Sequence, residues 1–195
     1  VLERVFDRSG AMADVFRAAV PDLGAMAARA SPSRERLASD VTSTIMANDY
    51  GVTDDLIPEI AEALGRDGLM ILQAALLDAR HQRRSAIGPV DDPIVRYDHG
   101  LARIRLALQA VADALGDVDA FIDAQDDGDL TNPVFASEIA IRLVPAGRAA
   151  EALAILERAP PGAMEVLVCL SAGGRTPGSP PWMSWSGVMK PRHCG

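Results

Sequence analysis

The stretch FASEIAIRLVPAGRAAEALAILERAP, residues 135–160, decides the class of fold that we predict for this chain. On both sides of its central Pro145–Gly147, apolar residues recur at steps of three and four, which is the spacing of one buried helix face. Ala and Leu favour helices, whereas Pro and Gly end them. The stretch therefore predicts two helices, 134–144 and 148–159, joined by a tight turn.

The same periodicity occurs further upstream. Seven apolar residues at alternating steps of three and four predict one helix of about 22 residues; they are Ile94, Tyr97, Leu101, Ile104, Leu108, Val111 and Leu115. The pair Asp92-Pro93 should cap its start. The same spacing also occurs in coiled coils, but three heptads are too few to identify one. We therefore expect a core helix.

Residues that end or cap helices predict the helices in the first half of the chain. Pro21 should separate two helices, 11–19 and 21–30, because proline lacks the backbone N–H. Ser31, directly before Pro32, should cap the next helix, because a hydroxyl accepts from the free N–H groups of a helix start. That helix should run to about Asn48.

The residues after Asn48 carry the same kind of signal. Thr53 should cap a helix that ends at Gly65, and a longer helix should follow from about Asp67 to Arg84. No segment alternates apolar and polar residues as a strand does. We therefore predict an all-α fold, built of irregular helical hairpins stacked as a short α-solenoid or repeat bundle.

The composition limits the classes of function. The chain has 195 residues and a formal net charge of −8, and Lys190 is its only lysine. Nucleic-acid binding needs clustered cations, so we expect no nucleic-acid partner. A negative field favours basic partners instead.

Features of membrane and secreted proteins are missing from the sequence. No apolar run reaches the roughly 20 residues of a membrane span, the first residues do not resemble a signal peptide, and Cys169 and Cys194 form no CxxC pair. We expect a cytoplasmic protein with no membrane partner. A chain without an initiator Met suits a segment of a longer protein. If preceding helices are missing from it, an apolar face of Val5, Phe6, Val15 and Phe16 needs cover, and we expect self-association to supply that cover.

Two acidic groups are the candidate partner-binding residues. The first group lies on one predicted helix and consists of Asp54, Asp55, Glu59 and Glu62. The second group lies in the loop DDGD and consists of Asp126, Asp127 and Asp129. Either group could be a merely solvated surface, which is the plainer interpretation. As functional surfaces, both would attract a protein or peptide partner with basic residues.

The acidic loop also permits an ion-binding interpretation, which is the alternative function that we carry. With Gly128 as the EF-hand glycine, the first four ligand positions fall on Asp123, Gln125, Asp127 and Asp129. The twelfth position, which should be a bidentate Glu, is Val134. The pattern therefore lacks the ligand that closes a calcium site, and we assign no metal.

Other chemistries have little support in the sequence. His81, His99 and His193 do not stand at metal-ligand spacing, and neither GxSxG nor a P-loop occurs. A basic patch of arginines could touch phosphate, although a helix-end cluster explains it better; it consists of Arg80, Arg83, Arg84, Arg103 and Arg105. We predict no catalytic residue, no cofactor and no enzymatic activity.

Residues 135–159 resemble a tetratricopeptide-type hairpin. Ile139, Ala140 and Leu143 match the core of its first helix and Gly147 matches its turn. The second helix repeats the small–large–small pattern of that motif with Ala152, Leu156 and Ala159. Small residues there let two helices touch. The resemblance implies a helical-repeat fold, whereas Pro160-Pro161 and the lack of a clean upstream copy depart from a regular array.

Residues 1–159 also resemble an uncharacterised bacterial family of helical-repeat domains, some of which accompany SWIM-type zinc-finger regions. The phrases that carry this resemblance are VFDRSGAMADVF, NDYGVTDDLIPEIAEALG, ALQAVADALGDVDAFI and AGRAAEAL. The family supplies no catalytic residues. We expect one all-α domain over residues 1–170 that serves as a protein-interaction module. Residues 171–195, rich in Gly and Pro with both tryptophans, should form an irregular tail.

Overall fold

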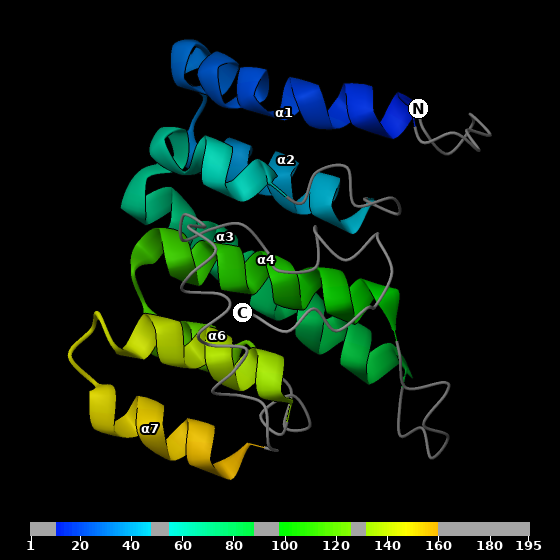
Figure 1. Cartoon of the computed structure of the whole chain (residues 1–195). Coiled ribbons are helices and arrows are strands. Elements are labelled where there is room, and N and C mark those ends of the chain that lie inside the picture. The colour runs from blue at the N-terminus through cyan, green and yellow to red at the C-terminus, as the bar shows by residue number, and fades with distance from the viewer. Residues whose placement is uncertain (1–10, 48–54, 88–97, 126–131, 160–195) are drawn as a thin grey trace. The chain divides into compact units, whose positions relative to one another are not determined.

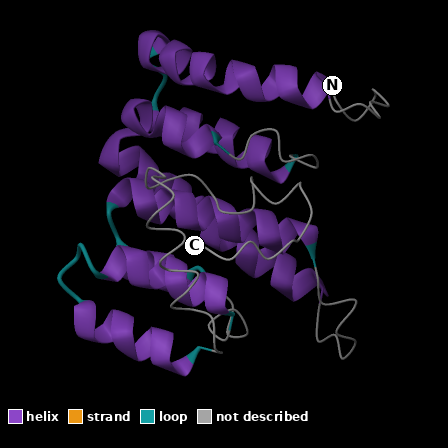
Figure 2. Ribbon diagram, in the orientation of Figure 1, coloured by secondary structure: helices purple, strands orange, loops and turns teal. Residues whose placement is uncertain are grey.

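A computed structural model describes residues 11–47, 55–87, 98–125 and 132–159. All regular structure in these ranges is helical (Figure 2), which confirms the all-α prediction. The helices are α1 (Ala11–Ala30), α2 (Arg34–Met46), α3 (Leu56–Ile87), α4 (His99–Leu115), α5 (Val118–Asp123), α6 (Pro133–Leu143) and α7 (Ala149–Arg158). They belong to two compact units that divide between Gly116 and Asp117. The single domain predicted over residues 1–170 stays a prediction.

The first unit is organised around α3, which packs against α1, α2 and α4 (Figure 1). One apolar side of each part of α3 is buried, whereas Met70 and Leu77 on another side of the second part are exposed. The buried residues are Leu56, Ile57, Ile60, Leu64, Leu69, Leu72 and Leu76. Neighbouring helices add Val41 and Ile45 from α2, and Ile104 and Val111 from α4. Burying an aliphatic side chain of this size stabilises a fold by roughly 1.5–3 kcal/mol, so these contacts hold the unit together.

The predicted break at Pro21 is wrong, because α1 runs without interruption from Ala11 to Ala30 with Pro21 inside it. An interior proline costs a helix about 3 kcal/mol. Val20 and Gly24, on either side of Pro21, are both buried, and α1 packs along α3. This packing holds the helix together across the proline.

The predicted cap of α2 is displaced by two residues. Ser33, not Ser31, caps the helix, and its hydroxyl accepts from the Arg36 backbone N–H at 3.2 Å. A residue before proline is disfavoured in the helical region, and Ser31 instead takes a positive φ of 45°. Pro32 therefore precedes the cap rather than opening the helix.

The predicted start of α4 is also wrong. Asp98 has an extended backbone, with φ −97° and ψ 114°, and its carboxylate accepts from the Leu101 backbone N–H at 2.8 Å. The helix thus begins at His99 instead of near Ile94, and Asp92 and Pro93 lie outside the described residues. The helix ends at Leu115, the last residue of the predicted pattern, and Gly116 after it is a left-handed cap.

The predicted stop at Gly65 is confirmed. This residue has φ 61° and ψ 178° between two helical stretches of α3. Only glycine adopts such a backbone readily, because any Cβ would be strained there. Gly65 therefore divides α3 into a first segment, which carries the predicted acidic residues, and a longer second segment.

In the second unit, α6 and α7 form the predicted hairpin. Asn132 caps α6 by accepting from the Val134 N–H at 2.9 Å. At the turn, the N–H groups of Gly147 and Arg148 donate to the carbonyls of Val144 and Leu143 at 3.0 and 2.9 Å, with Gly147 at φ 78°. This is the paired hydrogen bonding of a Schellman turn, which requires glycine at the left-handed position.

Charged side chains brace the second unit. Arg148 donates to Asp119 of α5 at 2.7 Å and holds Glu151 of α7 through both carboxylate oxygens. The Arg142 guanidinium lies 3.7 Å from the centroid of the buried Phe121 ring. In both units, no described helix is long and apolar enough to cross a lipid bilayer.

Candidate functional site

Three of the predicted acidic residues come together on the first segment of α3. Asp55 lies just before the helix, and Glu59 and Glu62 follow at steps of four and three residues. This spacing puts them on one helix face, opposite the buried stripe. Glu59 and Glu62 are exposed and Asp55 is half-buried. We call these three residues the acidic face; Asp54, the fourth predicted member, lies outside the described residues.

No cation neutralises the acidic face within the described part of the chain. Other acidic residues of the first unit do have arginine partners, in the pairs Asp14–Arg17, Arg34–Asp67, Arg36–Asp40 and Arg83–Asp98. Asp55, Glu59 and Glu62 make no such pair with any described residue. Their charges are therefore directed to solvent, where they can attract a basic partner.

A close helix contact fixes the main chain of this segment. Gly24 of α1 lies against α3 so closely that a Cβ atom on residue 24 would overlap the Glu59 carbonyl oxygen. Only glycine permits this approach. The backbone that carries the acidic face is therefore held by α1 on one side and by its own buried stripe on the other.

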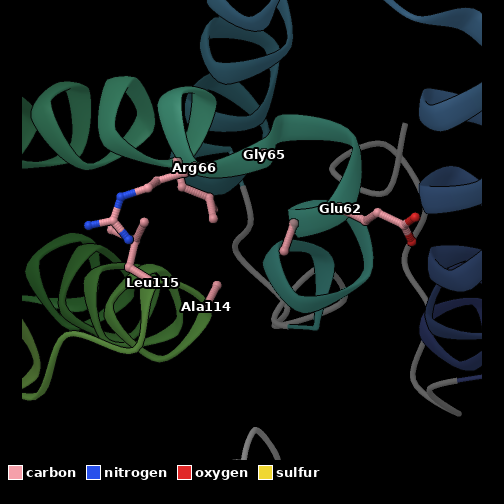
Figure 3. Close-up of a pocket in the computed structure, with 7 residues that line it drawn as sticks. Glu62, Gly65, Arg66, Ala114 and Leu115 are labelled. Atoms are coloured by element: carbon pink, nitrogen blue, oxygen red, sulfur yellow. The ribbon is translucent and has the colours of Figure 1, made fainter.

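A pocket of about 290 Å³ lies next to the acidic face (Figure 3). Its lining comes from both segments of α3 and from the end of α4: Ala61, Glu62, Gly65, Arg66, Leu69, Ala114 and Leu115. Alanine and glycine supply three of these positions, so little side-chain volume fills the space. Glu62 belongs both to the pocket and to the acidic face.

The helix interruption at Gly65 shapes this pocket. A Cβ added to Gly65 would have no neighbour within 4 Å, so the residue borders open space. Leu69 and Leu115 give the pocket apolar walls. The interruption was predictable from the sequence, but the pocket was not, because its two sides come from residues about fifty positions apart.

Opposite charges stand on the two sides of the pocket. The Arg66 guanidinium extends toward the end of α4 beside Leu115, whereas the Glu62 carboxylate points away from it (Figure 3). Both side chains are exposed, and neither makes an ion pair with a described residue. The site thus combines a hollow whose exposed lining is about equally polar and apolar with one unneutralised anion and one unneutralised cation.

The second predicted acidic group cannot be placed. Asp126, Asp127 and Asp129 lie outside the described residues, while Asp123 is exposed at the end of α5 and Gln125 is buried. Val134, at the twelfth loop position, lies in the first turn of α6. No group of three or more metal-ligating side chains occurs among the described residues. The ion-binding alternative stays a prediction.

The basic patch is engaged within the protein. Arg83 donates from Nε and Nη2 to the Asp98 carboxylate at 2.7 and 2.9 Å. These hydrogen bonds lower the pKa of Asp98 and raise that of Arg83. The other arginines of the patch also have interactions: Arg80, Arg84, Arg103 and Arg105. The helix-end interpretation therefore describes Arg83 better than a phosphate site does.

Comparison with known proteins places the chain in one family. Residues 1–168 match a family of unknown function, DUF6880. No curated protein matches the chain, and no solved structure does. The family match confirms the resemblance to an uncharacterised domain family and extends over most of the 195 residues. The chain therefore belongs to the DUF6880 family of unknown function.

Proposed function

We propose that this chain is a non-catalytic protein-interaction module whose acidic face contacts a basic or amphipathic segment of a partner protein. The observation that carries the proposal is the exposure of Glu59 and Glu62 without any ion pair among the described residues. Solvated carboxylates on a rigid backbone attract cations at little cost in reorganisation. The Gly24 contact supplies that rigidity.

The proposal includes a tetratricopeptide-like arrangement, in which successive helical hairpins stack as a short solenoid. The α6–α7 hairpin supports it, because Ala140 and Ala152, which match the small positions of that repeat, are both buried. Stacked hairpins present extended surfaces for peptide segments. We place the module in the cytoplasm, since Cys169 and Cys194 provide no disulfide framework.

Charge reversal tests the proposed function. The full chain is immobilised and partners are captured from a lysate of its own cells, with Glu59→Lys/Glu62→Lys as the test variant. Asp78→Lys/Glu157→Lys is the matched control, because both of these acids are exposed and lie outside the acidic face. Since each exposed ion pair contributes about 0.2–1 kcal/mol and its reversal adds repulsion, we expect binding to fall about tenfold or more in the test variant only. Equal capture by both variants would disprove the proposal.

A further inference from the structure

We propose that the pocket beside Gly65 is the anchor site of this surface, and that it receives one aliphatic side chain of the partner segment. A basic residue of that segment lies on the Glu62 side and an acidic residue on the Arg66 side. The inference rests on the proposed function, to which it adds the chemistry of the partner and the direction in which it binds.

The apolar part of the pocket accepts an aliphatic group. Its volume of about 290 Å³ lies at the small end of the range for ligand pockets, roughly 300–1,000 Å³. Leu69, Leu115 and two alanines supply about half of its exposed lining, and polar groups supply the other half. A Leu, Ile or Met side chain can contact this apolar half while the neighbouring residues of the segment meet the polar half.

The charges distinguish a peptide segment from a free amino acid. Glu62 and Arg66 point away from each other across the pocket (Figure 3). A free amino acid carries its ammonium and carboxylate groups on one carbon atom, so it cannot meet two side chains that diverge. A peptide with its charged residues on either side of an aliphatic one can meet both. The geometry therefore favours a segment of a protein.

The order of residues along α3 determines how the charged residues of the partner segment align with the helix. Asp55 and Glu59 precede Glu62, the pocket follows, and Arg66 comes last. A segment that lies along this helix encounters acids first, then the apolar pocket, then the cation. Its complementary order is basic, aliphatic, acidic. A segment aligned in this way is attracted, whereas one with its acidic residue beside Glu62 is repelled, so the charges align the segment along α3 whichever way its main chain runs.

Peptide selection followed by affinity measurement tests the inference. Random linear peptides are selected on the full chain, and the dissociation constant of each selected peptide is measured by fluorescence anisotropy. We expect peptides in which an aliphatic residue stands between a basic and an acidic residue. Ala114→Leu, which fills the pocket from an exposed position on α4, should weaken their binding at least tenfold. Ala74→Leu, an exposed position of α3 outside the pocket, is the matched control and should leave it unchanged.

A charge exchange supplies the second test. The double variant Glu62→Lys/Arg66→Glu should bind a selected peptide at least tenfold more weakly and recover affinity when the charged residues of the peptide are exchanged. Selection of no peptide, or binding that Ala114→Leu leaves unchanged, would overturn the anchor site. Binding lost in Ala114→Leu but retained in Glu59→Lys would overturn the acidic-face function instead, since Glu59 does not line the pocket.

Discussion

Gly24 of α1 lies directly against the main chain of Glu59 in α3, and no residue with a Cβ atom fits at that position without displacing the two helices. The contact joins two helices that are far apart in sequence. It lies at Glu59, the first exposed residue of the acidic face. The orientation of this face therefore depends on a buried glycine that carries no charge.

Replacement of Gly24 by alanine tests the close contact, because the contact should make a normally stabilising substitution destabilising. Gly24→Ala would stabilise an ordinary helix interior by about 0.5–1 kcal/mol, because alanine has the higher helix propensity. Here we expect a loss of roughly 1–3 kcal/mol from overpacking against the Glu59 carbonyl. Urea unfolding of both proteins measures the difference. A more stable Gly24→Ala variant would show that the helices do not touch.

A pair of asparagine substitutions tests the interruption of α3. Gly65→Asn should cost about 1–3 kcal/mol, because φ 61° with ψ 178° is a backbone region that only glycine enters readily. Gly116→Asn is the control and should cost less than about 1 kcal/mol, since its φ 68° and ψ 27° belong to the left-handed region that asparagine tolerates. Thermal unfolding distinguishes the two. Equal costs would mean that Gly65 does not hold this conformation.

The Arg83–Asp98 pair should make the free energy of unfolding depend on pH in the acidic range. Hydrogen bonds from Arg83 hold the folded-state pKa of Asp98 below its ordinary value. The ionised carboxylate therefore stabilises the fold above about pH 4, and this contribution disappears as pH falls through the lowered pKa. The pKa of Arg83 is raised beyond the accessible range and adds no dependence there.

Asp98→Asn isolates this effect, because asparagine keeps the cap acceptor of α4 and loses the charge. At pH 7 we expect the variant to be less stable by about 0.5–1 kcal/mol, since the Arg83 side chain is 41% exposed and solvent screens the pair. The difference should shrink as pH falls below about 4. Asp40→Asn, which breaks the exposed pair with Arg36, is the control and should change stability by a few tenths of a kcal/mol. A difference for Asp98→Asn that persists at pH 2 would contradict the assignment.

Small residues should be essential in the α6–α7 hairpin. Ala140→Leu adds three carbon atoms at a fully buried position and should cost about 1–3 kcal/mol through overpacking. Ala154→Leu makes the same change at an exposed position of α7 and should stay within about 0.5 kcal/mol of the parent. Chemical unfolding of the two variants provides the comparison. Equal stability would remove the packing argument for a tetratricopeptide-like hairpin.

The sequence predicted those features whose signal lies within a few residues. Gly65 and Gly147, which were predicted as a helix stop and a turn, both have a positive φ, and α4 ends at Leu115, the last residue of the predicted periodic pattern. Each of these signals is local, because a cap or stop acts on the adjacent helical turn. The exposed position of Glu59 and Glu62 was predictable for the same reason, because apolar residues of the same helix segment take the buried positions.

Features that depend on distant residues were not predictable in this way. Pro21 has the local signature of a break, but packing of α1 on α3 holds the helix together. Asp92 and Asp98 are both good capping residues, and the structure shows Asp98 in that role, where it also binds Arg83. The pocket escaped prediction because nothing near Gly65 in the sequence indicates that the end of α4 lies beside it.

The salt dependence of partner binding tests the central claim most directly. A selected peptide is titrated into the parent chain and into Glu59→Lys/Glu62→Lys at about 50 and 500 mM NaCl, because salt screens exposed charges within a Debye length of about 10 Å or less. We predict that the parent binds at least tenfold more tightly at low salt, and that the variant binds weakly without this dependence. Equal affinity of the two proteins at both salt concentrations would contradict the account.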